Sequence, residues 1–461
     1  MVLAAAAAWW LGFETERKSL ESRHRLPQRL PARPWGSMIS EGASMPIDPI
    51  EILRELVAIP SVNPMGRHDL TSAGECRLTD YLAARLTDLG LAVERQTIAP
   101  NRENLLARLD GDPRSESSGG VVLLDAHQDT LPADNMTIEP WSATVRDGRL
   151  YGRGACDVKG GMAAMIAAVS RLAAQRPAGM PTILLSCPID EEYQFSGVRG
   201  LTTAWREGKP PQRPRLPDAA IVAEPTGLDV VVAHKGIIRW FCHTHGKAAH
   251  SSQPARGASA IYKMARAVTA IERYSQEVLA ARPGHALCGP HTLNVGAIRG
   301  GTSVNIVPEL CKIEMEIRVP PGGDPQQARS ELIEYLQREY DSRWQSSPSV
   351  PLPHKSHVEH NAPYVQHDAP YMQGPALSDE ANGVLAERLC STVSGMTGGC
   401  QRHGVPYATH AAFYSAVGIP TVVFGPGAIE QAHTADEWIS LDQLHLATDI
   451  LYSFLKNWRP L

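Results

Sequence analysis

The sequence predicts an α/β fold with a central, mostly parallel sheet, interrupted by a smaller α+β domain. Three observations support this prediction. From Asp48 onward, short β-rich runs alternate with helical segments, as is typical of parallel sheets covered by helices. Residues 234–344 instead show the order β-α-β-β-α, which indicates a separate small core. After a connector rich in Pro, Ser and His, the α/β pattern returns.

Length and composition limit the classes of function. The 461 residues are enough for about two or three domains. A net charge of −5 gives no reason to expect nucleic acid or an anionic membrane as a partner. The eight cysteines are scattered, and none forms a CxxC pair. This usage favours a reduced, cytoplasmic chain over a disulfide framework or a structural zinc site.

The first 45 residues differ from the rest. Their apolar run, VLAAAAAWWLGF, is too short to span a bilayer as a helix. No Lys or Arg precedes it and no A-x-A-like site follows it, so it is a poor signal peptide. Because this run is so short, we interpret residues 1–45 as a disordered tail or a start codon called too early rather than as a membrane anchor. A later start could lie at Met38 or Met45, which both precede the first convincing helix.

The large domain is expected over residues 46–233 and 345–461. Asp48 as N-cap and Pro49 at the first helical position predict its first helix. A second helix stops at Gly90. Further helices are expected at about 160–176, 379–393 and 441–458, and strands at 105–109, 121–125, 182–188, 219–223 and 421–424.

The smaller domain is expected over residues 234–344. It begins with a strand, which a helix at about 258–281 follows. Strand-like segments at 291–297 and 303–319 come next, and a helix at 325–340 ends it.

Polar side chains gather where the strands of the large domain end. The set comprises His127, Asp129, Asp157, Asp190, Glu191, Glu192, Glu224 and His433. In open α/β sheets, ligands bind outside the carboxyl ends of the strands. A mixed set of imidazoles and carboxylates suits Zn, Mn or Co better than Ca or Mg.

The spacing of these residues suits two-metal hydrolysis. Two divalent ions about 3.5–4 Å apart need a shared carboxylate and can hold a hydroxide between them. Of the adjacent Glu191 and Glu192, one can ligate metal while the other serves as general base. Asp129, two residues after His127, can accept the second N–H of the imidazole and fix its tautomer.

Five motifs in this order, HQDTLP, GRGACDVKGG, DEEYQFSG, AEPT and QAHTADE, resemble a known family. It is the family of di-zinc deacylases and exopeptidases that includes acetylornithine deacetylase, succinyl-diaminopimelate desuccinylase, aminoacylase and carboxypeptidase G. The resemblance extends from about Ile47 to the C-terminus. It implies ligands for two zinc ions: His127, Asp157 and Glu224 for one, and Asp157, Glu192 and His433 for the other. It also implies that Glu191 is the general base and Asp129 the acid that orients the histidine.

The same resemblance assigns a role to the smaller domain, as a lid through which the chain forms a homodimer. His250, in GKAAHSSQPARGASAI, resembles a histidine that reaches the active site of the partner. The segment GGTSVNIVPELCKIEMEIRVPP resembles one that binds the substrate carboxylate, which implicates Asn305 and Arg318.

The function expected from these features is hydrolysis of the amide bond of N-acyl amino acids by a metal-bridged hydroxide. Glu191 would deprotonate the nucleophile and pass the proton to the departing amine, while the metals and His250 stabilise the oxyanion. The expected cofactor is two Zn²⁺ per chain, with Co²⁺ or Mn²⁺ as substitutes.

Two alternatives stay open. One is an aminopeptidase or dipeptidase of the same family, and the other is a non-catalytic binding protein, which has no use for Glu191. GPGAIEQAHTADEWISLDQL most resembles acetylornithine deacetylase-like members. YATHAAFYSAVGIP departs from them, because His410 stands where related enzymes usually have a carboxylate. That departure leaves the acyl group and the side-chain preference open.

Overall fold

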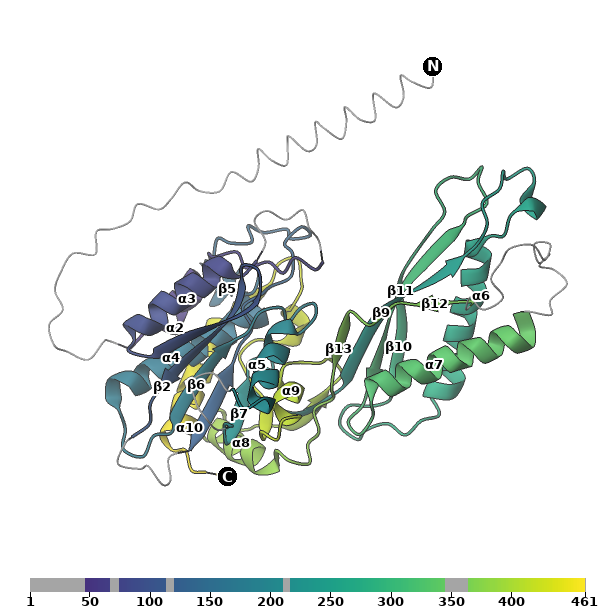
Figure 1. Ribbon diagram of the computed structural model, residues 1–461. Coiled ribbons are helices and arrows are strands. Elements are labelled where there is room, and N and C mark those ends of the chain that lie inside the picture. The colour runs from purple at the N-terminus through teal and green to yellow at the C-terminus, as the bar shows by residue number, and fades with distance from the viewer. Residues whose placement is uncertain (1–45, 67–73, 113–119, 210–215, 345–363, 461) are drawn as a thin grey trace, which may run out of the picture. The chain divides into compact units, whose positions relative to one another are not determined.

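The computed structural model describes residues 46–66, 74–112, 120–209, 216–344 and 364–460 (Figure 1). The predicted tail at residues 1–45, with its apolar run, lies outside these ranges. In the described ranges, no helix combines the length and the apolar character that crossing a membrane requires.

The centre of the large domain is an eight-stranded mixed sheet with the order β1-β2-β6-β3-β7-β15-β8-β14. The strands are β1 (Ala92–Ala99), β2 (Arg102–Leu109), β3 (Val121–Asp125), β6 (Thr182–Cys187), β7 (Ala219–Val222), β8 (Val230–His234), β14 (Arg402–Val405) and β15 (Thr421–Val423). Four neighbouring strands, β6, β3, β7 and β15, run parallel, while β1 and β2 are antiparallel at one edge. This arrangement confirms the predicted α/β class.

Helices cover both faces of this sheet. One side has α2 (Pro49–Val57), α3 (Cys76–Asp88), α4 (Gly160–Gln175), α8 (Gly383–Thr397) and α10 (Leu441–Lys456), and the other has α5 (Ser196–Arg206) and α9 (Ala411–Ser415) (Figure 1). Because side chains alternate along a strand, Val122 and Leu124 pack in the first core, while Val121 and Leu123 pack in the second. The central strands are therefore apolar on both faces.

The large domain has two further local features. The Asp48 side chain accepts the N–H of Ile50, and Pro49 opens α2, as predicted from the sequence. A small antiparallel sheet, with β4 (Thr144–Arg146), β5 (Arg149–Tyr151) and β16 (Trp438–Ser440), joins two segments that are distant in the sequence. It brings the chain after residue 437 close to the segment that precedes α4.

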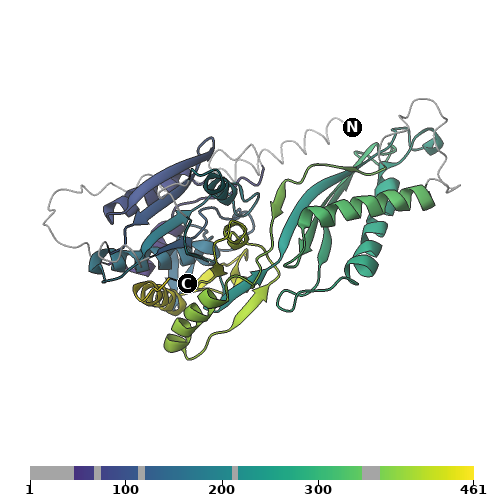
Figure 2. The ribbon, with the colours of Figure 1, turned by 60° about the horizontal axis from the view of Figure 1, so that its bottom comes forward.

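The insert, defined here as residues 236–374, has its own sheet and core. β10 (Thr292–Gly300), β11 (Leu310–Val319), β9 (Gly236–His245) and β12 (Gln366–His367) are neighbours in that order, and β13 (Met372–Gly374) also pairs with β9. α6 (Ala260–Arg273) and α7 (Pro325–Glu339) pack with these strands in one core (Figures 1 and 2). The predicted domain boundaries stay a prediction, but the sheet takes in two strands beyond residue 344.

The chain crosses between the large domain and the insert twice, and the two crossings are hydrogen-bonded to each other. The N–H of His234 donates to the carbonyl of Leu377 at 3.1 Å, and the N–H of Leu377 donates back at 3.0 Å. Gly236 approaches this return segment so closely that a Cβ would lie 2.9 Å from the backbone nitrogen of Ala376. The crossings therefore form one two-stranded ribbon.

Two features differ from the expectations. The predicted strand at 303–319 begins only at Leu310, so Asn305 lies in a loop. Cys390 and Cys400 form a disulfide, which corrects the expectation of a fully reduced chain. The cysteines meet because α8 ends at Gly398, whose positive φ of 85° turns the chain back.

A close contact at the start of α4 predicts a difference between two glycines. A Cβ on Gly161 would lie 2.7 Å from the Cβ of Ala223, whereas one on Gly395, an exposed residue of α8, meets nothing within 4 Å. Gly161→Ala should lower the free energy of unfolding by about 1–3 kcal/mol. Gly395→Ala should raise it by up to about 1 kcal/mol, because alanine favours helix. Denaturant titration measures both, and equal effects would contradict the packing constraint.

Candidate metal centre

The central strands deliver most of the predicted residues to one edge of the sheet. His127 follows β3, Glu191 and Glu192 follow β6, Glu224 follows β7, and His433 lies in the segment after β15. Because these strands are adjacent and parallel, their carboxyl ends meet at the same edge. Asp157 joins them from the turn Ala155–Lys159 that precedes α4, in which its own backbone is not helical.

Two groups of potential metal ligands meet at Asp157. His127, Asp157 and Glu224 form one group, and Asp157, Glu192 and His433 form the other. Within each group the ligand atoms all lie within 4.8 Å of one another. The two oxygens of Asp157 point to different imidazoles, since Oδ1 is 3.1 Å from His127 Nε2 and Oδ2 is 3.1 Å from His433 Nε2. Asp157 thus has the geometry of a shared carboxylate.

The charges of the site favour bound cations. Burial raises the pKa of Glu191 and that of Glu224 well above the usual range, and the neighbouring carboxylates add to this effect. Burial would lower the pKa of His433, but Asp157 and Glu192 raise it to about 11. Glu192 Oε1 is buried and has no hydrogen-bond partner in the described part of the chain. An unpartnered carboxylate oxygen among two imidazoles and further carboxylates fits a zinc-class ion.

The structure corrects the predicted contact of Asp129. The Nδ1–H of His127 faces the backbone carbonyl of Asp129 at 2.9 Å, whereas the carboxylate Oδ1 is 3.7 Å away. The carboxylate instead accepts the backbone N–H groups of Glu191 and Glu192, each at 3.0 Å. The Asp129 carboxylate therefore holds the Glu191–Glu192 loop, while the Asp129 backbone carbonyl orients the His127 imidazole.

Glu437 holds the Asp157 turn from behind, and the sequence reasoning missed it. Its Oε1 accepts the N–H of Cys156 at 2.9 Å and that of Asp157 at 3.0 Å. Its Oε2 accepts the N–H of Gly154 at 3.0 Å and is paired with Arg153 at 2.8 Å. Both side chains of this ion pair are buried. Glu437 lies four residues after His433, a spacing that by itself indicates no structural role.

His410 packs beside the metal centre as the partner of a buried carboxylate. Its Nδ1 lies 2.8 Å from Asp125 Oδ1, and the Tyr414 hydroxyl donates to Asp125 Oδ2 at 2.5 Å. The His410 ring is 6.3 Å from that of His127, edge to face. The carboxylate that contacts His410 is thus Asp125, at the end of β3.

The other three predicted residues lie on the insert. His250 and Asn305 are together, since the N–H of Ser251 donates to the Asn305 carbonyl at 3.0 Å, and both side chains are exposed. Arg318 lies near the opposite end of β11, where its Nε donates to Glu316 at 2.9 Å. The structure therefore separates Arg318 from the other two.

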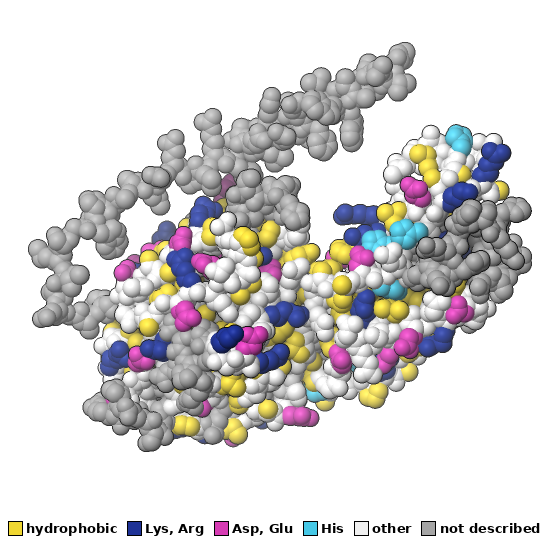
Figure 3. All heavy atoms as spheres, viewed as in Figure 1, with side chains coloured by type: hydrophobic (Ala, Val, Ile, Leu, Met, Phe, Trp, Pro, Cys, Tyr) yellow, Lys and Arg dark blue, Asp and Glu magenta, His cyan; other side chains and the backbone are white. Residues whose placement is uncertain are grey.

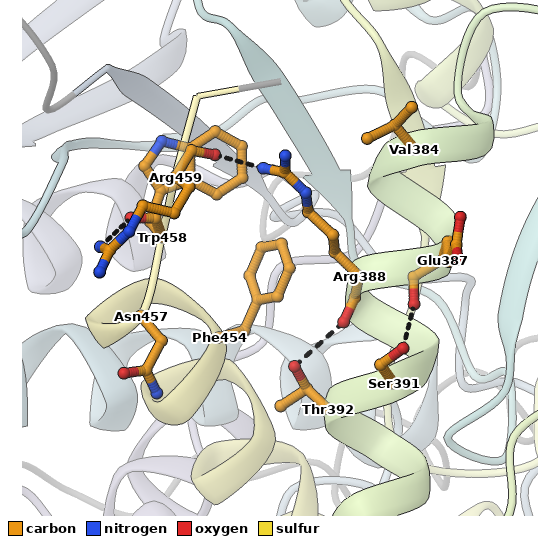
Figure 4. Close-up of a pocket in the computed structure, with 9 residues that line it drawn as sticks. All are labelled: Val384, Glu387, Arg388, Ser391, Thr392, Phe454, Asn457, Trp458 and Arg459. Carbon is orange, nitrogen blue, oxygen red and sulfur yellow. Dashed lines mark hydrogen bonds between the residues drawn. The ribbon is translucent and has the colours of Figure 1, made fainter.

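Two further features carry no catalytic groups. Histidine side chains gather on the insert (Figure 3), but His243 and His245 are bonded to Asp368 and Gln366, and no metal-ligand group among the described residues includes them. A cavity of about 550 Å³ lies between α8 and the end of α10 (Figure 4). Its charged side chains are Glu387, Arg388 and Arg459, and none of the predicted site residues lines it.

Comparisons with known proteins agree with this geometry. The family described as Peptidase family M20/M25/M40 matches residues 123–457. Acetylornithine deacetylase of Vibrio campbellii is 31% identical over 387 residues, which cover 82% of this chain and 90% of that protein. The M20 family metallo-carboxypeptidase Sso-CP2 of Sulfolobus solfataricus has a TM-score of 0.68 at 17% identity, over 89% of this chain and 99% of that one. YXEP of Bacillus subtilis, described as a dinuclear metal binding peptidase from the M20 family, has a TM-score of 0.59 at 16% identity, over 88% and 96%.

The position of Glu437 generates a prediction. Glu437→Gln should lower the free energy of unfolding by about 3–5 kcal/mol, because buried Arg153 loses its charged partner and an amide N–H₂ faces backbone donors. Metal affinity should fall as well, since the Asp157 turn loses its support. Asp436→Asn, an exposed neighbour, is the control and should change neither quantity. Denaturant titration and metal analysis test this, and equal behaviour of the two variants would refute the role.

Proposed function

The chain belongs to Peptidase family M20/M25/M40, whose members are hydrolytic enzymes that act on amides, and we propose that it hydrolyses N-acyl amino acids with two divalent metal ions. This identity sets aside the alternative of a non-catalytic binding protein. The observation that carries the proposal is the meeting of two ligand groups at Asp157, with Glu191 in the same loop as the ligand Glu192.

We propose zinc for both positions, with Co²⁺ or Mn²⁺ as substitutes. The residues fit such ions, because each group offers one imidazole and two carboxylates. His127, Asp157 and Glu224 would hold one ion, and Asp157, Glu192 and His433 the other. When bound, the two ions would lower the pKa of a water molecule and polarise the scissile carbonyl.

The chain's own residues would manage the protons and the developing negative charge. Glu191 would take a proton from the attacking water and pass it to the departing amine. His250 Nδ1 accepts the N–H of Ser252 at 3.2 Å, so the neutral imidazole carries its proton on Nε2. That Nε2–H is available to an oxyanion.

The layout of the insert supports the proposed homodimer. His245 pairs with Leu310 at one end of β11, and Arg318 lies eight residues further along. At about 3.3 Å per residue, this separation is about 26 Å along the strand. His250 and Asn305 lie beyond the Leu310 end, so they and Arg318 of one chain are too far apart to share a small substrate. A two-fold dimer would let each chain donate His250 and Asn305 to its partner.

Exposed apolar side chains on the insert support the same arrangement. β10 is an edge strand of the sheet, and Ile298 on it is 57% exposed. Tyr262 on α6 is 70% exposed, and Val304 in the adjoining loop is 98% exposed. An apolar edge of this kind is expected where a second copy of the chain pairs or packs.

Positive charge near the ribbon supports a substrate with a carboxylate. Lys235 is 3% exposed, and its ammonium has no hydrogen bond or ion pair among the described residues. Burial, together with the charge of Arg318, lowers its pKa. A substrate carboxylate would give the Lys235 ammonium a charged partner. His410 is bonded to Asp125, which argues against a role for it in binding a substrate ammonium, so we leave the side-chain preference open.

An aminopeptidase or dipeptidase activity is the second candidate, because structural neighbours include an aminopeptidase of Bacillus cereus and a di-peptidase of Saccharomyces cerevisiae. Both candidates use the same metals and the same base. The cytoplasmic location stays a prediction.

The proposed function predicts metal-dependent amide hydrolysis. Purified protein should release the amine from N-acetyl amino acids, contain about two zinc-class ions per chain, and lose turnover in chelator until Zn²⁺ or Co²⁺ is added. Glu191→Gln should keep both ions and lower kcat by about 10²–10⁴-fold, as expected for a positioned base. A panel of N-acyl amino acids and dipeptides, assayed by amine release, distinguishes the two candidates.

Glu192→Gln is the matched control for this experiment. It should instead reduce the metal content, because Glu192 belongs to one ligand group and Glu191 to neither. Full turnover in a verified metal-free preparation would end the two-metal proposal. If Glu192→Gln kept its metals and Glu191→Gln lost them, the two roles would be reversed.

The dimer proposal predicts complementation between two inactive variants. His250→Ala should keep its metals and lose about 2–4 kcal/mol of transition-state stabilisation, as when an oxyanion donor is removed. After subunit exchange with Glu191→Gln, mixed dimers contain one site with both groups intact, so activity should return. Mixtures that stay inactive although exchange is demonstrated would show that His250 does not act across the dimer.

A further inference from the structure

The Glu191–Glu192 loop rests on a single buried carboxylate. Asp129 Oδ1 accepts the N–H of Glu191 and Asp129 Oδ2 accepts that of Glu192, so two consecutive amides are fixed by one side chain. A carboxylate that accepts two successive N–H groups fixes the direction of that stretch of backbone. It thereby also fixes the directions in which both side chains point. The orientation of Asp129 therefore controls the orientation of Glu191.

A second buried carboxylate lies at the start of the same loop. Asp190 has a positive φ of 66°, a left-handed conformation that is uncommon for residues other than glycine. Its Oδ2 accepts the hydroxyl of Ser196 at 2.6 Å, and its carbonyl accepts the N–H of Phe195 at 2.7 Å. Arg102 lies 3.3 Å from its Oδ1. Asp190 thus closes the loop on itself.

Asn63 joins these two carboxylates. It is fully buried in the segment after α2, and its Nδ2 donates to Asp129 Oδ2 at 2.8 Å and to Asp190 Oδ1 at 2.9 Å. Its Oδ1 accepts the N–H of Met65 at 2.8 Å, and its own N–H donates to the carbonyl of Thr130 at 2.9 Å. Both polar atoms of the Asn63 side chain are used, so the amide cannot turn without breaking hydrogen bonds.

A neutral amide is the side chain that such a position requires. Two buried carboxylates that share one partner repel each other, and two N–H groups on a single nitrogen satisfy both without a third charge. A carboxylate in its place would add a third negative group and would offer a donor to neither Asp129 nor Asp190. An aliphatic side chain would leave two buried acceptors each short of a hydrogen bond.

We propose that Asn63 is a positioning residue of the active site. By bridging Asp129 and Asp190, it holds the Glu191–Glu192 loop so that Glu191 faces the attacking water while Glu192 faces the metal. This inference rests on the proposed function of Glu191. A displacement of about 1 Å in a catalytic group lowers turnover by on the order of 10²-fold, and an effect of that size is expected here.

The test compares Asn63→Ala, Asn63→Asp and Asn382→Ala in the metal-loaded enzyme. Asn382 is an equally buried amide whose Nδ2 donates to the carbonyls of Val232 and Thr421, away from the site, so it controls for the general loss of a buried amide. Asn63→Ala should lower kcat about 10²-fold, with KM within about threefold of wild type. Asn382→Ala should keep kcat within about threefold at a similar loss of stability.

Asn63→Asp separates positioning from the filling of space. If Asn63 only fills space, the isosteric Asn63→Asp should be milder than Asn63→Ala. If Asn63 supplies donors to two carboxylates, Asn63→Asp should lower kcat at least as much as Asn63→Ala. Asn63→Ser, which keeps a single donor, is measured beside them, and its kcat should fall between those of wild type and Asn63→Ala. With three variants, the comparison can still be made if one of them does not fold.

Amide hydrogen exchange in metal-free protein gives a readout without turnover. The N–H groups of Glu191 and Glu192 should exchange at least about tenfold faster in Asn63→Ala and at the wild-type rate in Asn382→Ala, because only the first variant frees Asp129. Unchanged exchange, or equal losses of kcat in both variants, would overturn the inference while leaving the proposed function standing. If wild-type protein hydrolyses neither N-acyl amino acids nor dipeptides, the proposed function fails, and exchange alone decides the role of Asn63.

Discussion

The carboxylate of Asp157 between two imidazoles is the interaction on which the rest of the site depends. Its two oxygens each lie 3.1 Å from a different histidine, and those histidines follow different strands of the sheet. Such an arrangement requires the carboxyl ends of β3 and β15 to meet, and it requires the turn before α4 to stay in place. Glu437 keeps the turn in place, because it accepts a backbone N–H of the turn and is itself paired with Arg153. Fold and chemistry are therefore linked through one short segment.

Much of this site could be predicted because it obeys a general rule of α/β sheets. His127, Glu224 and His433 are recognisable as residues after apolar strands, and adjacent parallel strands bring them together. Asn63 and Glu437 could not be found in this way, because they act on backbone N–H groups of distant loops. Such contacts appear only when the loops are placed in space. The same holds for Asp129, whose own backbone carbonyl outcompetes its carboxylate for the imidazole.

The fold, too, has features that could be predicted from the sequence and features that could not. The start of α2, with its clear cap, and the limits of α4 and α10 were predicted close to those observed. The edge strand β1 was not, because its sequence AVERQTIA is polar and largely open to solvent, so it carries no apolar run. The disulfide between Cys390 and Cys400 depends on a glycine turn, which residue spacing does not reveal. Sequence patterns report burial well and turn geometry poorly.

The ribbon formed by the two chain crossings has a mechanical consequence. Separate single-strand linkers would let the insert swivel and slide independently of the large domain. Here the crossings are bonded to each other through His234 and Leu377, so neither can lengthen or twist without the other. The insert is therefore attached to the large domain by one paired segment and not by two independent linkers.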